Sequence, residues 1–450
     1  MKTLPSQPAR AAISAAVSAI SLVALSACTS MAPAAGPADL ALYAGRPLAG
    51  SHVTVADSES HAVLTGATAE VPKPAAPKVP PSRVSVSKTG KDGADDALSL
   101  RFTDSSYASL SVEAEPGLDL RPYLARGVLA FDLNVKDLAQ GGLSFKVNCG
   151  KDCERKVPYL IAGRAAAGKG WRHLAFALSC FVHEGDDFSA IGQPFAVDAS
   201  GTGELAVANV RMLADGTPNA SCPDYRTISV TPDLLNESWS VNWWLPRHQE
   251  KLAEIAHRAA AHEPIELVFI GDSITHNWEK DGAKVWERNY GHYHALDLGF
   301  GGDRTENILW RLQHGEIDGI HPKVAVMMLG TNNTGQRQED PRTTAAGVAR
   351  DIAEVRRRLP DTKILLLAVF PRDATVDGPL RQRNAKVNAI ISGFADNQKV
   401  FFLNINQAFL DANGGLSKDI MPDLLHPNER GYEMWAAAMA PTLQRLMRQP

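Results

Sequence analysis

The stretch Ile265-Glu266-Leu267-Val268-Phe269-Ile270-Gly271-Asp272-Ser273-Ile274-Thr275 decides the fold of the C-terminal half of the chain. Its apolar run has the length of a buried strand, and a turn with glycine and polar residues follows it. Comparable runs recur downstream at 294–298, 324–329, 364–370 and 400–403, with helical patterns at 343–359, 380–394 and 429–447. Buried strands that alternate with helices predict a doubly wound, flavodoxin-like parallel α/β sheet over residues 241–450.

Polar or glycine-rich groups follow the first three predicted strands, at the sheet edge where a doubly wound fold binds its ligand. They are Gly271-Asp272-Ser273, Gly299-Phe300-Gly301-Gly302-Asp303 and Gly330-Thr331-Asn332-Asn333, and Asp423-Leu424-Leu425-His426 precedes the last helix. Each group alone is compatible with an ordinary turn or loop. Together they supply a hydroxyl, backbone donors, a carboxamide and an Asp/His pair, which is the set that nucleophilic acyl transfer requires.

These four blocks resemble those of the SGNH, or GDSL, hydrolase superfamily. The run 294–312 is most similar to the platelet-activating factor acetylhydrolase-like esterases, and the likeness covers about residues 236–447. The resemblance implies a carboxylic ester hydrolase for short acyl groups. It implies that Ser273 is the nucleophile, that Asp423 and His426 complete a triad, and that Gly302 and Asn332 help to bind the oxyanion.

The chemistry requires the same residue types. A serine hydroxyl is a poor nucleophile at neutral pH, so His426 must accept the Ser273 proton and later return one to the leaving alcohol. Asp423, three residues earlier, can reach the other ring nitrogen of His426 across one turn. The backbone N–H groups of Ser273 and Gly302, with the Asn332 amide, would converge on the oxyanion. This mechanism needs no cofactor and no metal.

Residues 48–215 have a different pattern, in which short alternating runs such as 98–102, 128–133 and 205–210 are separated by turn residues. Such runs predict an antiparallel β-sandwich. The stretches 168–181 and 208–212 resemble the galactose-binding-like module of some bacterial exo-β-glucosidases. We expect residues 216–240 to link this domain to the hydrolase domain at 241–450.

The first 28 residues resemble a bacterial lipoprotein signal, because an apolar segment at 11–25 follows basic residues and Leu25-Ser26-Ala27-Cys28 closes it. The resemblance implies export and lipidation of Cys28, with an ordinary secretory signal as the alternative. Thr29, where an Asp would favour inner-membrane retention, implies an outer-membrane anchor on the periplasmic or cell-surface side. The Ala- and Pro-rich residues 29–47 would form a tether.

Four cysteines remain after Cys28, an even number that fits an oxidising compartment. They allow three disulfide pairings. The short loop between Cys149 and Cys153 favours closing on itself, which would leave Cys180 to pair with Cys222. Zinc binding is a weaker alternative, because the spacing is not that of paired zinc ligands.

Composition excludes several classes of protein. The chain has 46 basic and 50 acidic residues and a net charge of −4, which argues against a nucleic-acid partner. A hydrophobic fraction of 44% excludes a wholly disordered chain.

The substrate alternatives are acylated carbohydrate, suggested by export and the β domain, and a lipid ester, suggested by the acetylhydrolase likeness. A glycan-binding lipoprotein with an idle hydrolase domain is a third hypothesis, and the complete set of site residues argues against it.

Overall fold

The computed structural model describes residues 36–72, 83–150, 153–237 and 239–448 of the chain. The predicted signal segment with Cys28 lies outside the described residues, as does the first part of the predicted tether. Within the described ranges, none of the helices combines the length and the apolarity that crossing a membrane requires.

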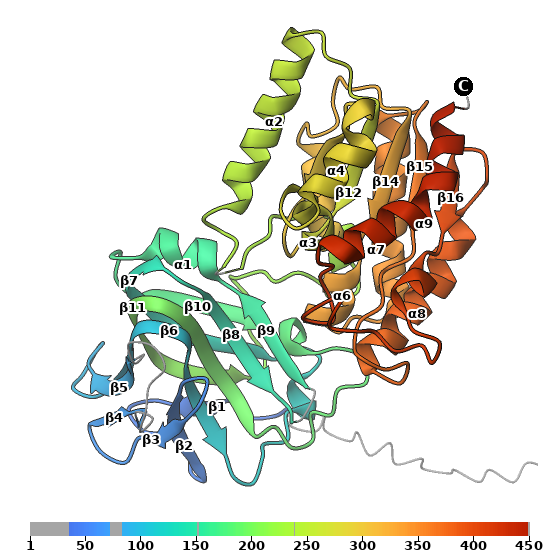
Figure 1. Cartoon of the computed structure of the whole chain (residues 1–450). Helices are drawn as coiled ribbons and strands as arrows, with labels where there is room; N and C mark the ends of the chain where they lie inside the picture. The colour runs from blue at the N-terminus through green and yellow to red at the C-terminus, as the bar shows by residue number, and fades with distance from the viewer. Residues whose placement is uncertain (1–35, 73–82, 151–152, 238, 449–450) are drawn as a thin grey trace, which may run out of the picture. The chain divides into compact units, whose positions relative to one another are not determined.

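The N-terminal region forms an eleven-stranded antiparallel sheet, in agreement with its alternating pattern (Figure 1). Hydrogen bonding joins all eleven strands, because the long strands β6 and β11 change partners along their lengths. Their buried side chains share one apolar core. The strands are β1 (Leu40–Tyr43), β2 (Ser51–Ala56), β3 (His61–Val63), β4 (Thr68–Glu70), β5 (Arg83–Thr89), β6 (Ala97–Ala114), β7 (Val128–Gln140), β8 (Leu143–Asn148), β9 (Glu154–Pro158), β10 (Arg172–Ala177) and β11 (Gln193–Leu213), with one helix, α1 (Leu160–Ala166).

Strand β1 lies inside the range 29–47 that we predicted to be a tether. Its residue Leu40 pairs with Met212 of β11, and its Leu42 and Tyr43 side chains are buried. Burial of one large apolar side chain contributes about 1.5–3 kcal/mol, which is enough to hold a short strand against a sheet. Residues 40–43 therefore belong to the sheet, although the surrounding Ala, Pro and Gly residues suggested a tether.

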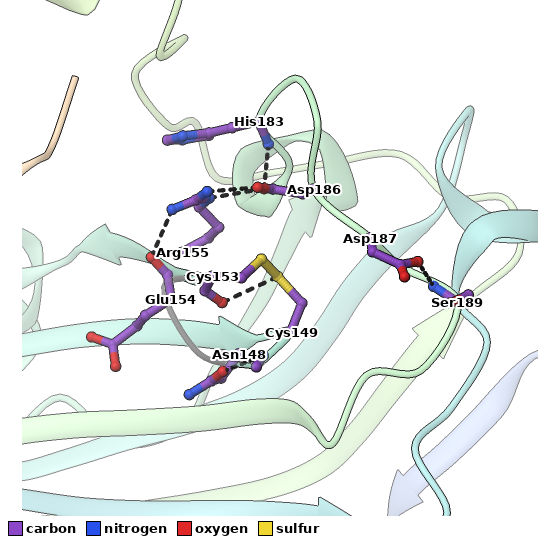
Figure 2. Close-up of a disulfide and its surroundings, with 10 residues drawn as sticks. Asn148, Cys149, Cys153, Glu154, Arg155, His183, Asp186, Asp187 and Ser189 are labelled. Atoms are coloured by element: carbon purple, nitrogen blue, oxygen red, sulfur yellow. Dashed lines mark hydrogen bonds and ion pairs between the residues drawn. A yellow bond between two sulfur atoms is a disulfide. The ribbon is translucent and has the colours of Figure 1, made fainter. Parts of the chain in front are cut away.

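Both favoured disulfide pairings are present. Cys149–Cys153 closes the turn between β8 and β9, and Cys180–Cys222 closes a longer loop. Figure 2 shows the first disulfide beside Arg155, whose guanidinium binds a nearby carboxylate. A disulfide sulfur is not the thiolate that metal binding needs, so this pair argues against the zinc alternative.

The C-terminal region contains a five-stranded parallel sheet in the order β13-β12-β14-β15-β16. This is the flavodoxin-like order, so the predicted doubly wound fold is confirmed. The strands are β12 (Leu267–Gly271), β13 (Leu296–Gly299), β14 (Val324–Met328), β15 (Lys363–Leu367) and β16 (Val400–Leu403). The helices are α2 (Trp244–Ala260), α3 (Ser273–His276), α4 (Ala283–Tyr290), α5 (Thr305–Gln313), α6 (Thr331–Gln336), α7 (Pro341–Arg358), α8 (Pro379–Ile391) and α9 (Glu429–Arg448).

Two apolar cores cover the two faces of this sheet, because successive strand residues point to opposite sides. On one face, Leu267 and Phe269 of β12 pack with Trp435 of α9. On the other face, Val268 and Ile270 of the same strand belong to the cluster that includes side chains of α5, α7 and α8. Strands buried on both sides leave only their ends open to a substrate.

The last part of the predicted linker packs against the hydrolase domain. The Ser229 carbonyl accepts a hydrogen bond from Thr305 Oγ1 at 2.9 Å, and the Asp233 carbonyl accepts one from Asn307 Nδ2 at 3.0 Å. Both donors lie in the first turn of α5. These contacts bring residues 229–237 to the start of α5, which directly follows the glycine-rich turn at 299–303.

Candidate active site

Ser273 is the first residue of α3 and follows β12 through a tight turn. Asp272 caps the helix, since its Oδ1 accepts a hydrogen bond from the Ile274 backbone N–H at 3.0 Å. Gly271 makes the turn possible, because a Cβ there would lie 2.5 Å from the Met328 carbonyl oxygen. The first N–H of a helix has no partner inside the helix. Among the described residues, the Ser273 N–H has no acceptor elsewhere either.

The Ser273 hydroxyl is hydrogen-bonded to His426, which lies 153 residues further along the chain. The Ser273 Oγ and His426 Nε2 atoms are 2.8 Å apart. On the other side of the ring, His426 Nδ1 lies 2.6 Å from Asp423 Oδ2. The structure therefore brings the three predicted triad residues into one continuous chain of hydrogen bonds.

Asp423 fixes the turn that carries His426. Its Oδ1 accepts hydrogen bonds from the backbone N–H groups of Leu425 at 3.0 Å and His426 at 2.7 Å. Burial opposes ionisation of this carboxyl, but the hydrogen bonds from His426 hold the pKa of Asp423 below its usual value. Asp423 is therefore a carboxylate at neutral pH. Leu424 between them has a φ of +60°, a left-handed conformation that a bulky residue rarely adopts.

The glycine-rich turn and α6 place Gly302 and Asn332 side by side. Gly302 is in the left-handed region, with φ +78°, and its backbone N–H has no acceptor among the described residues. Asn332 is buried, and its Nδ2 donates to the Asp303 carbonyl at 3.0 Å. The turn is joined to α3 by the Gly301 N–H, which donates to His276 Nδ1 at 3.2 Å. Within the described residues, Ser273 and Gly302 thus each keep a backbone N–H without an acceptor, and Asn332 places a carboxamide against the glycine-rich turn.

A line of hydrogen bonds orients the Asn332 carboxamide. Its Oδ1 accepts from Gln336 Nε2 at 3.2 Å. Gln336 in turn accepts from Arg304 at 2.6 Å, and the same guanidinium donates to Glu237 at 2.6 Å. Arg304 is 8% exposed, so this network is held mostly away from water. The segment before α2 is therefore connected to the amide that would bind an oxyanion.

A buried ionic cluster contacts the glycine-rich turn at 299–303. Arg311 is fully buried, and its Nε donates to Asp303 Oδ2 at 2.8 Å. It also pairs with the buried Glu316 and lies over the Phe300 ring, 3.9 Å from the centroid. Trp244 Nε1 donates to the other oxygen of Asp303. Burial raises the pKa of Asp303 to about 7, and the Arg311 cation with the hydrogen bonds from Trp244 and Arg311 opposes this rise.

Asp297 of β13 gives a prediction for stability as a function of pH. Its Oδ1 accepts from the Gly299 N–H at 2.7 Å, its Oδ2 has no partner in the described structure, and burial raises its pKa to about 8. Between about pH 4 and pH 8 the folded state binds more protons at this site than the unfolded state, so stability falls as pH rises. Asp297→Asn keeps an acceptor for the Gly299 N–H and has no proton to lose, so its stability should not fall in this way. Measured by denaturant unfolding, the free energy of unfolding of the variant relative to wild type should rise by roughly 1 to 4 kcal/mol from pH 5 to pH 8.5.

The exposed Asp361 provides the control for this measurement, as Asp361→Asn makes the same chemical change outside the core. A difference between Asp297→Asn and wild type that stays constant across the pH range would contradict the assignment of a raised pKa to Asp297.

Sequence reasoning did not single out several residues around the site. Arg311 and Gln336 have side chains typical of a solvated helix surface, and only the packing shows that Gln336 bonds to Asn332 and Arg311 to Asp303. Trp239 lay in the predicted linker. The hydrogen-bonding position of Asp272 could have been inferred, because an Asp before a helix is a common cap.

Comparisons with known proteins show which families the two regions of the chain match. Residues 269–434 match the GDSL-like lipase/acylhydrolase family, and residues 63–212 match a galactose-binding domain-like family. The alpha1 subunit of platelet-activating factor acetylhydrolase IB from Bos taurus is 32% identical over 207 residues, which cover 46% of this chain and 84% of that protein. The alpha2 subunit from Rattus norvegicus is 33% identical over 190 residues, which cover 42% of this chain and 78% of that protein.

Among solved structures, the extra C-terminal domain of an exo-1,3/1,4-β-glucanase from a Pseudoalteromonas species is also similar. It has 17% sequence identity and a TM-score of 0.33, and the match covers 41% of this chain and 96% of that chain.

Proposed function

This chain belongs to the GDSL-like lipase/acylhydrolase family and is a carboxylic ester hydrolase, and from that premise we propose that it is a serine esterase that removes short acyl groups, chiefly acetyl, from carbohydrate. The observation that carries the proposal is the continuous hydrogen bonding from Ser273 through His426 to Asp423, at 2.8 and 2.6 Å. A hydroxyl within hydrogen-bond reach of an oriented base is the geometry of an activated nucleophile.

In this proposal, Ser273 Oγ attacks the ester carbonyl carbon while His426 Nε2 accepts its proton. The Ser273 and Gly302 N–H groups and the Asn332 amide bind the oxyanion, while Asp423 stabilises the imidazolium. His426 then protonates the leaving alcohol, and the acyl group remains on Ser273. Water attacks the acyl-enzyme and gives a proton to His426. The carboxylic acid leaves, and Ser273 recovers its proton.

Two observations support a short acyl group. The similar mammalian proteins are named as acetylhydrolases. From Trp239 to the end of the described chain, the exposed large apolar side chains are few, namely Trp239, Leu245 and Val376. A lipase for long chains needs a broader apolar surface to receive its substrate.

The carbohydrate part of the proposal is supported by the β domain. Residues 63–212 match a galactose-binding domain-like family, and they form a domain separate from the hydrolase fold in the same chain. The second candidate is a lipid ester of the platelet-activating factor type, which the names of the similar mammalian subunits favour. The predicted lipid anchor on Cys28 fits both candidates, because it would place the enzyme at a membrane that faces external glycans or lipids. Mass spectrometry of the chain extracted from membranes would detect the acyl chains on Cys28.

The deciding experiment measures acid release by the full chain, purified in detergent. The substrates are acetylated xylan and other acetylated glycans, beside short- and long-chain lipid esters, and Ser273→Ala is the control. Acetate from the glycans that is lost in the variant would support the proposal. Release from lipid esters alone would replace it with the lipid candidate.

A further inference from the structure

Trp239 is the exposed member of the eight tryptophans in the chain, with 48% of its surface accessible, while the others are buried or half-buried. It lies in the turn that precedes α2, outside the sequence blocks that suggested the site. An indole gains free energy by leaving water, so its exposure is a cost to the folded chain. Single exposed apolar residues are common, however, and exposure alone carries no function.

The position of the Trp239 ring is the informative observation. A Cβ built on Gly302 would lie 1.9 Å from Cη2 of Trp239, so the edge of the indole fills the space that a side chain at position 302 would occupy. Gly302 is the turn residue to which the proposed mechanism assigns an oxyanion donor. The exposed ring therefore packs against the turn that carries this proposed donor.

The turn is held in this position by several contacts. The Trp239 carbonyl accepts a hydrogen bond from Trp243 Nε1 at 2.8 Å. The Trp243 ring packs beside Gly301, 3.3 Å from a Cβ built there, and its centroid is 6.0 Å from that of His276. The fully buried Ser240 donates to the Leu235 carbonyl at 2.8 Å. These contacts fix the turn that carries the exposed indole to α2 and to the glycine-rich turn.

We propose that Trp239 is the platform on which the sugar ring that carries the ester packs, so that it selects the alcohol part of the substrate. The inference rests on the proposed function. One flat apolar face with polar groups close by suits a pyranose ring, whose faces carry C–H groups and whose edges carry hydroxyls. Glu237, two residues before Trp239, accepts a hydrogen bond from Arg304 at 2.6 Å.

The test compares two acetate esters with the full chain purified in detergent. One is an acetylated xylo-oligosaccharide, and the other is ethyl acetate, whose alcohol is too small to cover an indole. Trp239→Ala should raise KM for the oligosaccharide at least about tenfold and leave kcat/KM for ethyl acetate within about twofold. Trp239→Phe keeps a smaller aromatic face, so its KM for the oligosaccharide should lie between those of wild type and Trp239→Ala. Leu245→Ala removes a similarly exposed apolar side chain from α2 and serves as the matched control.

Three results would overturn the platform. An equal loss on both esters would mean that Trp239 acts only by supporting the Gly302 turn, and an unchanged KM for the oligosaccharide would mean that the sugar does not contact it. An effect confined to a short-chain phospholipid ester, measured in parallel, would assign the indole to a lipid. The activity of the wild-type protein distinguishes a failure of the platform from a failure of the proposed function. If wild type hydrolyses ethyl acetate but releases no acetate from the oligosaccharide, both the carbohydrate assignment and the platform fail.

Discussion

Ser273→Ala is expected to lower kcat for acetate release by about 10⁴-fold or more, with little change in KM. The methyl group cannot form the acyl-enzyme, and what remains is the contribution of substrate binding and the oxyanion donors. Because Ser273 and His426 act as one unit, the double variant with His426→Ala should be no more impaired than either single variant. Steady-state kinetics on ethyl acetate measures all three.

The control is Ser392→Ala, which removes an exposed serine hydroxyl that donates only to a local carbonyl. Thermal unfolding of each variant checks that the protein remains folded. Full esterase activity in Ser273→Ala would disprove the assignment of the nucleophile, and additive losses in the double variant would show that His426 does not act through Ser273.

Arg311→Met is expected to lower the free energy of unfolding by about 3 to 5 kcal/mol. Arg311 is fully buried between the carboxyls of Asp303 and Glu316, which are also fully buried. Removing the guanidinium leaves these acids without their cation in a medium that solvates charge poorly, and they must either bind protons or admit water. Denaturant unfolding at pH 7 measures the loss.

Two further variants make this prediction specific. Arg288→Met removes an exposed arginine whose partner Glu433 is also half in water, so it should change stability by less than about 1 kcal/mol. Adding Asp303→Asn and Glu316→Gln to Arg311→Met should recover part of the lost stability, because the unpaired acids are then gone. If Arg311→Met were as stable as Arg288→Met, the buried cluster would not have the role assigned to it.

The sequence was sufficient for the framework of the hydrolase domain. The five apolar runs and the helices between them are local patterns, and burial on both faces of a parallel sheet leaves few other arrangements. The same local character made Ser273, Asp423 and His426 visible as candidates, because each follows or precedes an element at the ligand-binding edge. The alternating pattern likewise predicted the antiparallel sheet of the β domain.

Only the tertiary structure decided which distant side chains share an environment. Residues 40–43 resemble a tether by composition, but β11 supplies a strand partner more than 160 residues away in sequence. The sequence suggests a surface position for Arg311, but in the folded chain its guanidinium is buried against Asp303 and Glu316. The sequence likewise places Trp239 in a linker, whereas in the folded chain its indole packs against Gly302. Periodicity records which face of an element is apolar, whereas the energies of buried charge and of close packing depend on neighbours that only the folded chain brings together.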